Sequence, residues 1–143
     1  MSSSSSNRAS LRSVDVPGWP APKGYVNGVV ATGRTLYVAG QVGWNERHEF
    51  PSDDLAEQFG AALDNVLAVV RAAGAAPTDV ARMLVYVTDL EAYRASQKRL
   101  GQIWRERFGR HYPAMALVGV SGLVEVKAKV EIEAVAVLPE EGG

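Results

Sequence analysis

One short segment constrains the fold more than any other part of the chain. Residues 80–88 contain the run Met83-Leu84-Val85-Tyr86-Val87, which is apolar at successive positions. The run is too short for an ordinary helix, and a strand that is apolar on both faces is typical of burial on both faces. The sequence therefore predicts a central strand whose two faces both need cover.

Two helices are predicted around this strand. Asp54 and Glu57 form a capping-box pattern, apolar residues recur at helical spacing over residues 55–70, and Gly74 supplies a C-terminal stop. A second amphipathic pattern covers residues 93–108.

The remaining periodic segments predict strands. Residues 25–31 and 35–44 are β-rich and are separated by Thr32-Gly33-Arg34, which predicts a hairpin. Residues 114–120 form another strand, and residues 128–137 alternate between apolar and polar positions. The order ββαβαββ predicts an α+β fold with a mixed sheet and both helices on one face.

This order leaves one face of the sheet without cover. Two helices cover only one face of a five- or six-stranded sheet, and the chain offers no further element for the other face. We therefore expect a homo-oligomer in which the sheets of different copies pack together, with sites between the subunits.

Length and composition predict one folded domain. The chain has 143 residues, of which 47% are hydrophobic, which suffices for one core but not for two ordinary domains. Residues 1–14 are Ser-rich and are expected to form a disordered tail, which leaves residues 15–143 as the single domain.

Several classes of partner are disfavoured. The net charge is -1, so no long-range field attracts nucleic acid or an anionic membrane. No apolar stretch is long enough to span a membrane, and the start of the chain lacks the apolar part of a secretory signal, so a cytoplasmic protein is expected. There is no cysteine and no metal-ligand or nucleotide-binding motif, so neither a metal site nor a cofactor is expected.

Short segments along the chain resemble the RidA/YjgF family in order and spacing. They cover residues 24 to 137 together, although each is common by itself. The segments are GYVNGV (24–29), AGQV (39–42), Gln58, LDNV (63–66), AG (73–74), DV (79–80), VYVTDL (85–90), YPA (112–114) and VEIEAVA (130–136).

The resemblance implies a chorismate-mutase-like fold and a homotrimer with three clefts at the subunit interfaces. Active members of the family hydrolyse imino or enamino acids there and release ammonia. By this resemblance, Tyr25 and Glu131 are the candidate catalytic residues, and Gly40 and Gln41 are candidate substrate-binding residues.

Three cleft positions depart from the family pattern. The family's deaminases have an Arg after Pro-Ala that clamps the substrate carboxylate, and here that residue is Met115, which cannot form the clamp. Gln97 falls where the family usually has an Asn, and Leu117 falls where it often has a small polar residue or Cys. Trp44 is a further candidate substrate-binding residue, because its ring could form an aromatic wall of the cleft.

Each candidate residue also has a purely structural interpretation. Glu131 could be an ordinary polar residue on the outward face of an alternating strand, and Tyr25 could only pack its ring. Met115 could be plain core. Arg34, Arg110, Lys127 and Lys129 lie near predicted strand ends and could replace the missing Arg, but solvated surface charge is the simpler interpretation of each.

The favoured hypothesis is hydrolytic deamination, or a related hydrolysis, of a reactive enamine or imine that lacks a free α-carboxylate. The alternative is a trimer that binds a metabolite without turnover and has a regulatory role. RNA cleavage with translation inhibition, which is attached to parts of the family, is disfavoured by the near-zero charge and by the lack of a basic-aromatic stripe.

Overall fold

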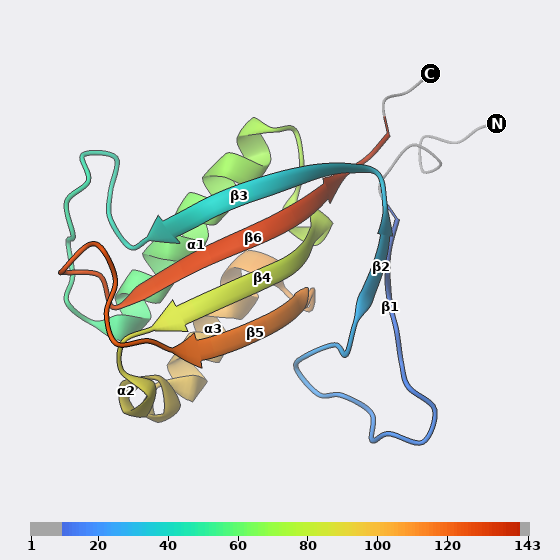
Figure 1. The fold of residues 1–143 in the computed structure, drawn as a ribbon, viewed down its shortest axis with the longest axis horizontal. Coiled ribbons are helices and arrows are strands. Elements are labelled where there is room, and N and C mark those ends of the chain that lie inside the picture. The colour runs from blue at the N-terminus through green and yellow to red at the C-terminus, as the bar shows by residue number, and fades with distance from the viewer. Residues whose placement is uncertain (1–9, 141–143) are drawn as a thin grey trace.

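A mixed four-stranded sheet forms the centre of the computed structural model, which describes residues 10–140. Strands β4 and β5 run parallel, and the other neighbours run antiparallel. Helices α1 and α3 cover one face of the sheet, and the short helix α2 lies near one end (Figure 1). In sheet order the strands are β3 (Arg34–Val42), β6 (Val130–Leu138), β4 (Val80–Val87) and β5 (Ala114–Gly119). The helices are α1 (Leu55–Ala72), η2 (Pro77–Asp79), α2 (Leu90–Ala95) and α3 (Gln97–Phe108).

The core lies between the sheet and these helices. Met83, Val85 and Val87 of β4 are completely buried there. Leu63 and Val66 of α1 are also completely buried and belong to the same cluster. Full burial of a side chain of this size contributes roughly 1.5 to 3 kcal/mol, so this layer dominates the stability of the domain. The predicted α+β fold with helices on one face is confirmed.

The other side of the sheet has no helix over it within residues 10–140 (Figure 1). Leu84 and Tyr86 of β4 are half-buried on this side, while Tyr37 of β3 is 78% exposed. We call this surface the open face. Its members are Tyr37, Arg82, Leu84, Tyr86, Val118, Glu131, Glu133 and Val135. The expectation that another copy covers it stays a prediction.

Helix α1 begins and ends where the sequence predicts. The Asp54 side chain accepts a hydrogen bond from the Glu57 backbone N–H at 3.0 Å, and Gly74 follows the helix with a φ of 88°. The second predicted helix is divided into α2 and α3 at Ser96. The Ser96 hydroxyl donates to the Ala92 carbonyl at 2.8 Å, a local bond that competes with regular helix continuation.

The predicted hairpin of residues 25–31 and 35–44 is wrong. Strand β2 (Val29–Thr32) pairs with β1 (Ser10–Ser13), whereas β3 pairs with β6. The β1–β2 ribbon runs away from the sheet in a different direction from β3 (Figure 1). The expected disorder of residues 1–14 is therefore wrong for residues 10–13, because backbone pairing orders them, and residues 1–9 lie outside the described residues.

Gly33 makes the corner between the ribbon and the sheet. Its φ is 148°, and a Cβ at this position would overlap the Leu138 carbonyl oxygen and lie 2.9 Å from Val137 Cγ1. Only glycine fits this backbone shape and this close approach. The Thr32-Gly33-Arg34 segment, which the sequence analysis interpreted as a tight hairpin turn, therefore forms a corner between two sheets.

We expect Gly33→Ala to destabilise the protein by about 1 to 3 kcal/mol, because it adds backbone strain and a clash with a backbone carbonyl. Chemical denaturation measures the change in the free energy of unfolding. Gly122→Ala is the control, since a Cβ there meets nothing within 4 Å. Equal stability of the two variants would contradict the role assigned to Gly33.

Candidate functional site

A cavity of about 510 Å³ lies between helix α3 and the edge strand β5. It brings together three of the predicted substrate-binding residues, Gln97, Met115 and Leu117. We call it the α3–β5 pocket. Its lining residues are Lys23, Gly24, Phe59, Tyr93, Gln97, Leu100, Gly101, Trp104, Arg105, Tyr112, Met115 and Leu117.

The pocket wall on β5 faces the helices. Met115 and Leu117 stand two residues apart and pair in register with Met83 and Val85, which are buried in the core. Since side chains alternate along a strand, Met115 and Leu117 point to this same side. Met115 is 40% exposed, so it lines the pocket and is not plain core.

Stacked rings fix the chain that leads into β5. Trp104 stacks on Tyr112 with ring centroids 6.2 Å apart and an interplanar angle of 4°. The indole N–H of Trp104 also donates to the His111 carbonyl at 3.1 Å. These contacts position residues 111–113, and so the start of β5, against α3.

Among the described residues, two cations, Arg105 and Lys23, line the pocket, and no carboxylate does. Gln97, Gly101 and Arg105 occur every four residues on α3 and therefore share one helix face. Arg105 Nη1 lies 3.3 Å from where a Cβ on Gly101 would be, so the guanidinium lies over this glycine. Cations near strand ends were considered from the sequence as replacements for the family's Arg, and neither Arg105 nor Lys23 was identified there. Arg105 lies eight residues after Gln97, two steps of four along the helix, and this spacing would have indicated it.

Tyr93 adds a neutral hydroxyl to the pocket. Burial raises the pKa of Tyr93 above its ordinary value of 10.0, because the phenolate is poorly solvated there. The side chain is therefore protonated at neutral pH and can donate a hydrogen bond.

Glu131 lies on the other side of the sheet, on the open face. Its register partner on β4 is Tyr86, which pairs in turn with Val118 of β5. Within residues 10–140 the Glu131 carboxylate has no hydrogen-bond partner, whereas Glu133 accepts a hydrogen bond from the Tyr86 hydroxyl at 2.6 Å. Glu131 is thus the available carboxylate on this strand, and Glu133 is engaged.

Gly40 provides the space that the Glu131 side chain occupies. A Cβ on Gly40 would overlap the Glu131 carboxylate and lie 2.9 Å from Glu131 Cδ. Gly40 lies at an irregularity in the β3–β6 pairing, between Val38 and Gln41. The Gln41 amide donates to the Ala39 carbonyl at 3.1 Å and so stabilises the same irregularity.

The buried side chain of Gln58 anchors the start of β6. Its amide N–H₂ donates to the carbonyls of Ser52 and Lys127, each at 2.9 Å, and its carbonyl accepts from the Lys129 backbone N–H at 2.7 Å. Lys129 is two residues before Glu131. This network therefore fixes the backbone that carries Glu131.

The other two predicted site residues, Trp44 and Tyr25, do not line the pocket. Trp44 follows β3 and stacks on His48 with ring centroids 3.9 Å apart. The Asn65 side chain donates to the Trp44 carbonyl at 2.9 Å and holds this loop on α1. Tyr25 is 53% exposed in the segment between β1 and β2, next to the pocket residues Lys23 and Gly24.

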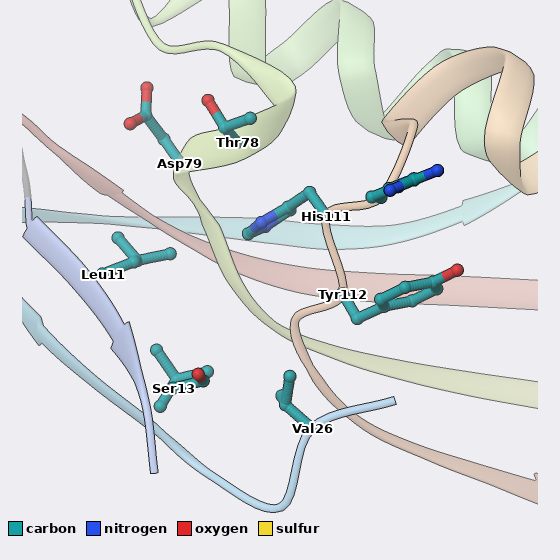
Figure 2. Close-up of a pocket in the computed structure, with 9 residues that line it drawn as sticks. Leu11, Ser13, Val26, Thr78, Asp79, His111 and Tyr112 are labelled. Carbon is teal, nitrogen blue, oxygen red and sulfur yellow. The ribbon is translucent and has the colours of Figure 1, made fainter. Parts of the chain in front are cut away.

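A second cavity, of about 410 Å³, lies where the β1–β2 ribbon meets the start of β4. Figure 2 shows Leu11 and Ser13 of β1 on one side and His111 and Tyr112 on the other. His111 Nε2 lies 2.7 Å from the Val80 carbonyl oxygen, so this ring is used to join the loop to β4. None of the predicted site residues lines this cavity.

The described residues show no cluster of three His, Asp or Glu side chains that could hold a metal ion. No helix within residues 10–140 is long and apolar enough to cross a membrane.

Residues 19–138 match the family model described as endoribonuclease L-PSP. The chain is 31% identical over 128 residues to the 2-iminobutanoate/2-iminopropanoate deaminase of Dermatophagoides farinae, an alignment that covers 89% of this chain and 96% of that protein. Among solved structures, the Rid-family protein YyfB from Yersinia pestis has a TM-score of 0.79 and 34% identity, covering 90% of this chain and 98% of that one. E. coli TdcF with bound serine has a TM-score of 0.63 and 32% identity, covering 88% and 98%.

These matches define an α+β protein of the Rid fold. The chain belongs to the RidA/YjgF family, which the family model describes as endoribonuclease L-PSP. Its relatives include proteins named as deaminases of imines.

We expect Gly40→Ala to move the Glu131 carboxylate with little loss of stability, because the clash falls on the end of a flexible side chain. Stability should change by less than about 1 kcal/mol relative to Gly122→Ala. A crystal structure of the variant should show Glu131 in a different rotamer. A Glu131 side chain in the same rotamer as in the wild type would contradict its close contact with Gly40.

The Tyr86–Glu133 hydrogen bond raises the pKa of Tyr86 above 10.0, and the negative charge of Glu133 adds to this effect. Glu133→Gln should lower the pKa of Tyr86 towards its ordinary value. Because the folded-state pKa is raised, the stability that Tyr86 contributes is present below pH 10 and is lost as the pH rises through the folded-state pKa. Alkaline titration of phenolate absorbance measures this shift. The titration of Tyr86→Phe is subtracted from that of the wild type, and the titration of the Tyr86→Phe, Glu133→Gln double variant from that of Glu133→Gln. The same Tyr86 titration in both backgrounds would contradict the shift.

Proposed function

We propose that this protein hydrolyses a reactive enamine or imine to a carbonyl compound and ammonia, with Glu131 as the residue that positions and deprotonates water. The observation that carries the proposal is the Glu131 carboxylate, which lies against Gly40 and has no hydrogen-bond partner among residues 10–140, while the neighbouring Glu133 is bonded to Tyr86. The name of the Dermatophagoides farinae relative, an imine deaminase, supports the same reaction class.

The reaction needs few groups. Water attacks the carbon of the protonated C=N bond while Glu131 accepts a proton from that water. The protonated Glu131 returns this proton to the nitrogen of the resulting carbinolamine. Ammonia then leaves as the hydroxyl proton passes back to Glu131, and a carbonyl group remains. Tyr25 is the second candidate catalytic residue, as a hydrogen-bond donor to the substrate.

A complete site needs two copies of the chain. Met115 and Leu117 face the helices, whereas Glu131 faces the opposite side of the sheet, so one chain cannot bring both to a single substrate. We propose a homotrimer in which the α3–β5 pocket of one copy meets the Glu131 side of the next. The exposed Tyr37 and Val118 of the open face support burial against a second copy.

Other candidate residues divide between the two halves of this site. Gln97, Met115 and Leu117 would contact the substrate from the pocket. Gly40 and Gln41 belong to the half that contains Glu131, whereas Trp44 lies in the loop after β3 and is assigned to neither half.

The proposed substrate does not present a free α-carboxylate to residue 115. Met115 has no hydrogen-bond donor on its side chain, so the clamp found in the family's deaminases has no counterpart on β5. An imine or enamine with an apolar group next to the C=N bond fits Met115 and Leu117 better.

We expect Glu131→Gln to lower kcat by about 10² to 10⁴-fold, because the amide cannot accept the proton from water. Imines generated in situ from amino acids by an amino-acid oxidase serve as substrates, and carbonyl product above the spontaneous rate is measured. Glu133→Gln is the matched control on the same strand and should retain activity within a few-fold.

Equal loss in both variants would contradict the role of Glu131. A rate on 2-aminoacrylate as high as that of an Arg-bearing relative would contradict the substrate part of the proposal. Ligand binding without any turnover would favour the metabolite-binding alternative. RNA cleavage that is lost with Glu131→Gln would overturn the proposed reaction class.

A further inference from the structure

The three arginines at positions 99, 105 and 107 of helix α3 have different surroundings. Arg99 pairs with Asp54 at 2.9 Å and with Glu57 at 3.3 Å. Arg107 pairs with Asp64 at 2.8 Å. Arg105, within the described residues, has no carboxylate partner and lines the α3–β5 pocket. The helix therefore uses two of these arginines to hold α1 and leaves the third available to a ligand.

The loop between β1 and β2 adds a second positive charge to the same pocket. Lys23 lines it together with Gly24, and within residues 10–140 no acidic side chain lines it. Two cations in one pocket without a counter-ion repel each other, and an anion bound between them removes this repulsion. The planar guanidinium of Arg105 can also donate two parallel hydrogen bonds to a carboxylate.

Apolar side chains form much of the remaining wall, beside the polar groups of Tyr93 and Gln97. Leu100, Met115 and Leu117 form walls, and Trp104 contributes an aromatic surface. Gly101 leaves room on α3, because the nearest group to a Cβ there is the Arg105 guanidinium itself. The pocket thus combines an apolar wall on β5 with the positive charges of Arg105 on α3 and Lys23 in the loop between β1 and β2.

We propose that Arg105, assisted by Lys23, forms an anion subsite that binds the carboxylate of an amphipathic ligand whose apolar part lies along Met115 and Leu117. The inference rests on the proposed function in one respect: the ligand is the imine or enamine substrate, with its carboxylate held by α3 and not by β5. The substrate class is then an imine or enamine whose carboxylate is separated from the C=N bond by an apolar spacer.

Direct binding tests the subsite without turnover. The probe is hexanoate, with hexanamide as its uncharged counterpart, titrated into the full-length protein by calorimetry. We expect hexanamide to bind at least about tenfold more weakly than hexanoate, because it lacks the charge that strengthens the hydrogen bonds to Arg105. Equal binding of the two probes would overturn the proposal.

Substitutions assign the effect to Arg105. Arg105→Gln should weaken hexanoate binding by about tenfold or more, and Arg105→Lys should fall between this variant and the wild type, because it keeps the charge but loses the planar fork. Lys23→Gln should have a smaller effect. Arg99→Gln is the control on the same helix, since it removes only surface ion pairs and should leave binding unchanged. Unchanged binding in Arg105→Gln would overturn the subsite.

The two proposals fail separately in this design. Glu131→Gln should keep hexanoate binding, because in this proposal Arg105 and Lys23 hold the carboxylate, and hexanoate has no C=N bond for Glu131 to act on. Arg105-dependent binding without hydrolysis of any imine would keep the subsite and reject the enzymatic function. Imine hydrolysis that is insensitive to Arg105→Gln, with equal binding of hexanoate and hexanamide, would reject the subsite and keep the function.

Discussion

The positions of the candidate site residues depend on one constraint: within residues 10–140, helices pack on one face of the sheet and leave the other open. Met83, Val85 and Val87 are completely buried beneath these helices, and they fix which side of each neighbouring strand is inside. Because side chains alternate along each strand and neighbouring strands pair in register, the same sides of β5 and β6 are also determined. Met115 consequently faces the helices and Glu131 faces away from them.

This division separates the residues proposed to bind substrate from the residue proposed to transfer a proton. The α3–β5 pocket offers apolar walls and positive charge, and the open face offers the Glu131 carboxylate, which has no hydrogen-bond partner among residues 10–140. A sheet is one layer of backbone, and side chains on its two faces cannot reach each other through it. In the proposed homotrimer the two halves meet between copies of the chain, and the same contact would cover the exposed apolar groups of the open face.

Each half is held by a different kind of interaction. In the pocket, stacked rings and the hydrogen bond from Trp104 to the His111 carbonyl position β5 against α3. On the other side, the buried amide of Gln58 satisfies three backbone groups and fixes the start of β6. A buried amide with all these partners is stabilising, whereas the loss of one would leave a buried polar group unsatisfied. Gln58 therefore fixes the backbone two residues before Glu131.

The sequence by itself determined the α+β class, the helix from Asp54 to Gly74 and the strand that carries Glu131. These features follow from periodicity and capping, which are local properties of the chain. The resemblance of short segments also identified the family and the substitution at Met115. The break at Ser96 was not predicted, because the apolar pattern continues across it and one local hydroxyl bond decides it.

Only the tertiary structure decided which segments meet. Gly33 makes a corner because the Leu138 carbonyl lies against it, and nothing near residue 33 in the sequence indicates that contact. Arg105 differs from Arg99 and Arg107 only through its surroundings, since carboxylates of α1 and its N-cap lie near the other two. Contacts between residues far apart in the chain arise from packing, and no local pattern encodes them. The sequence thus named Glu131 and Met115, and the structure showed that they lie on opposite faces of one sheet.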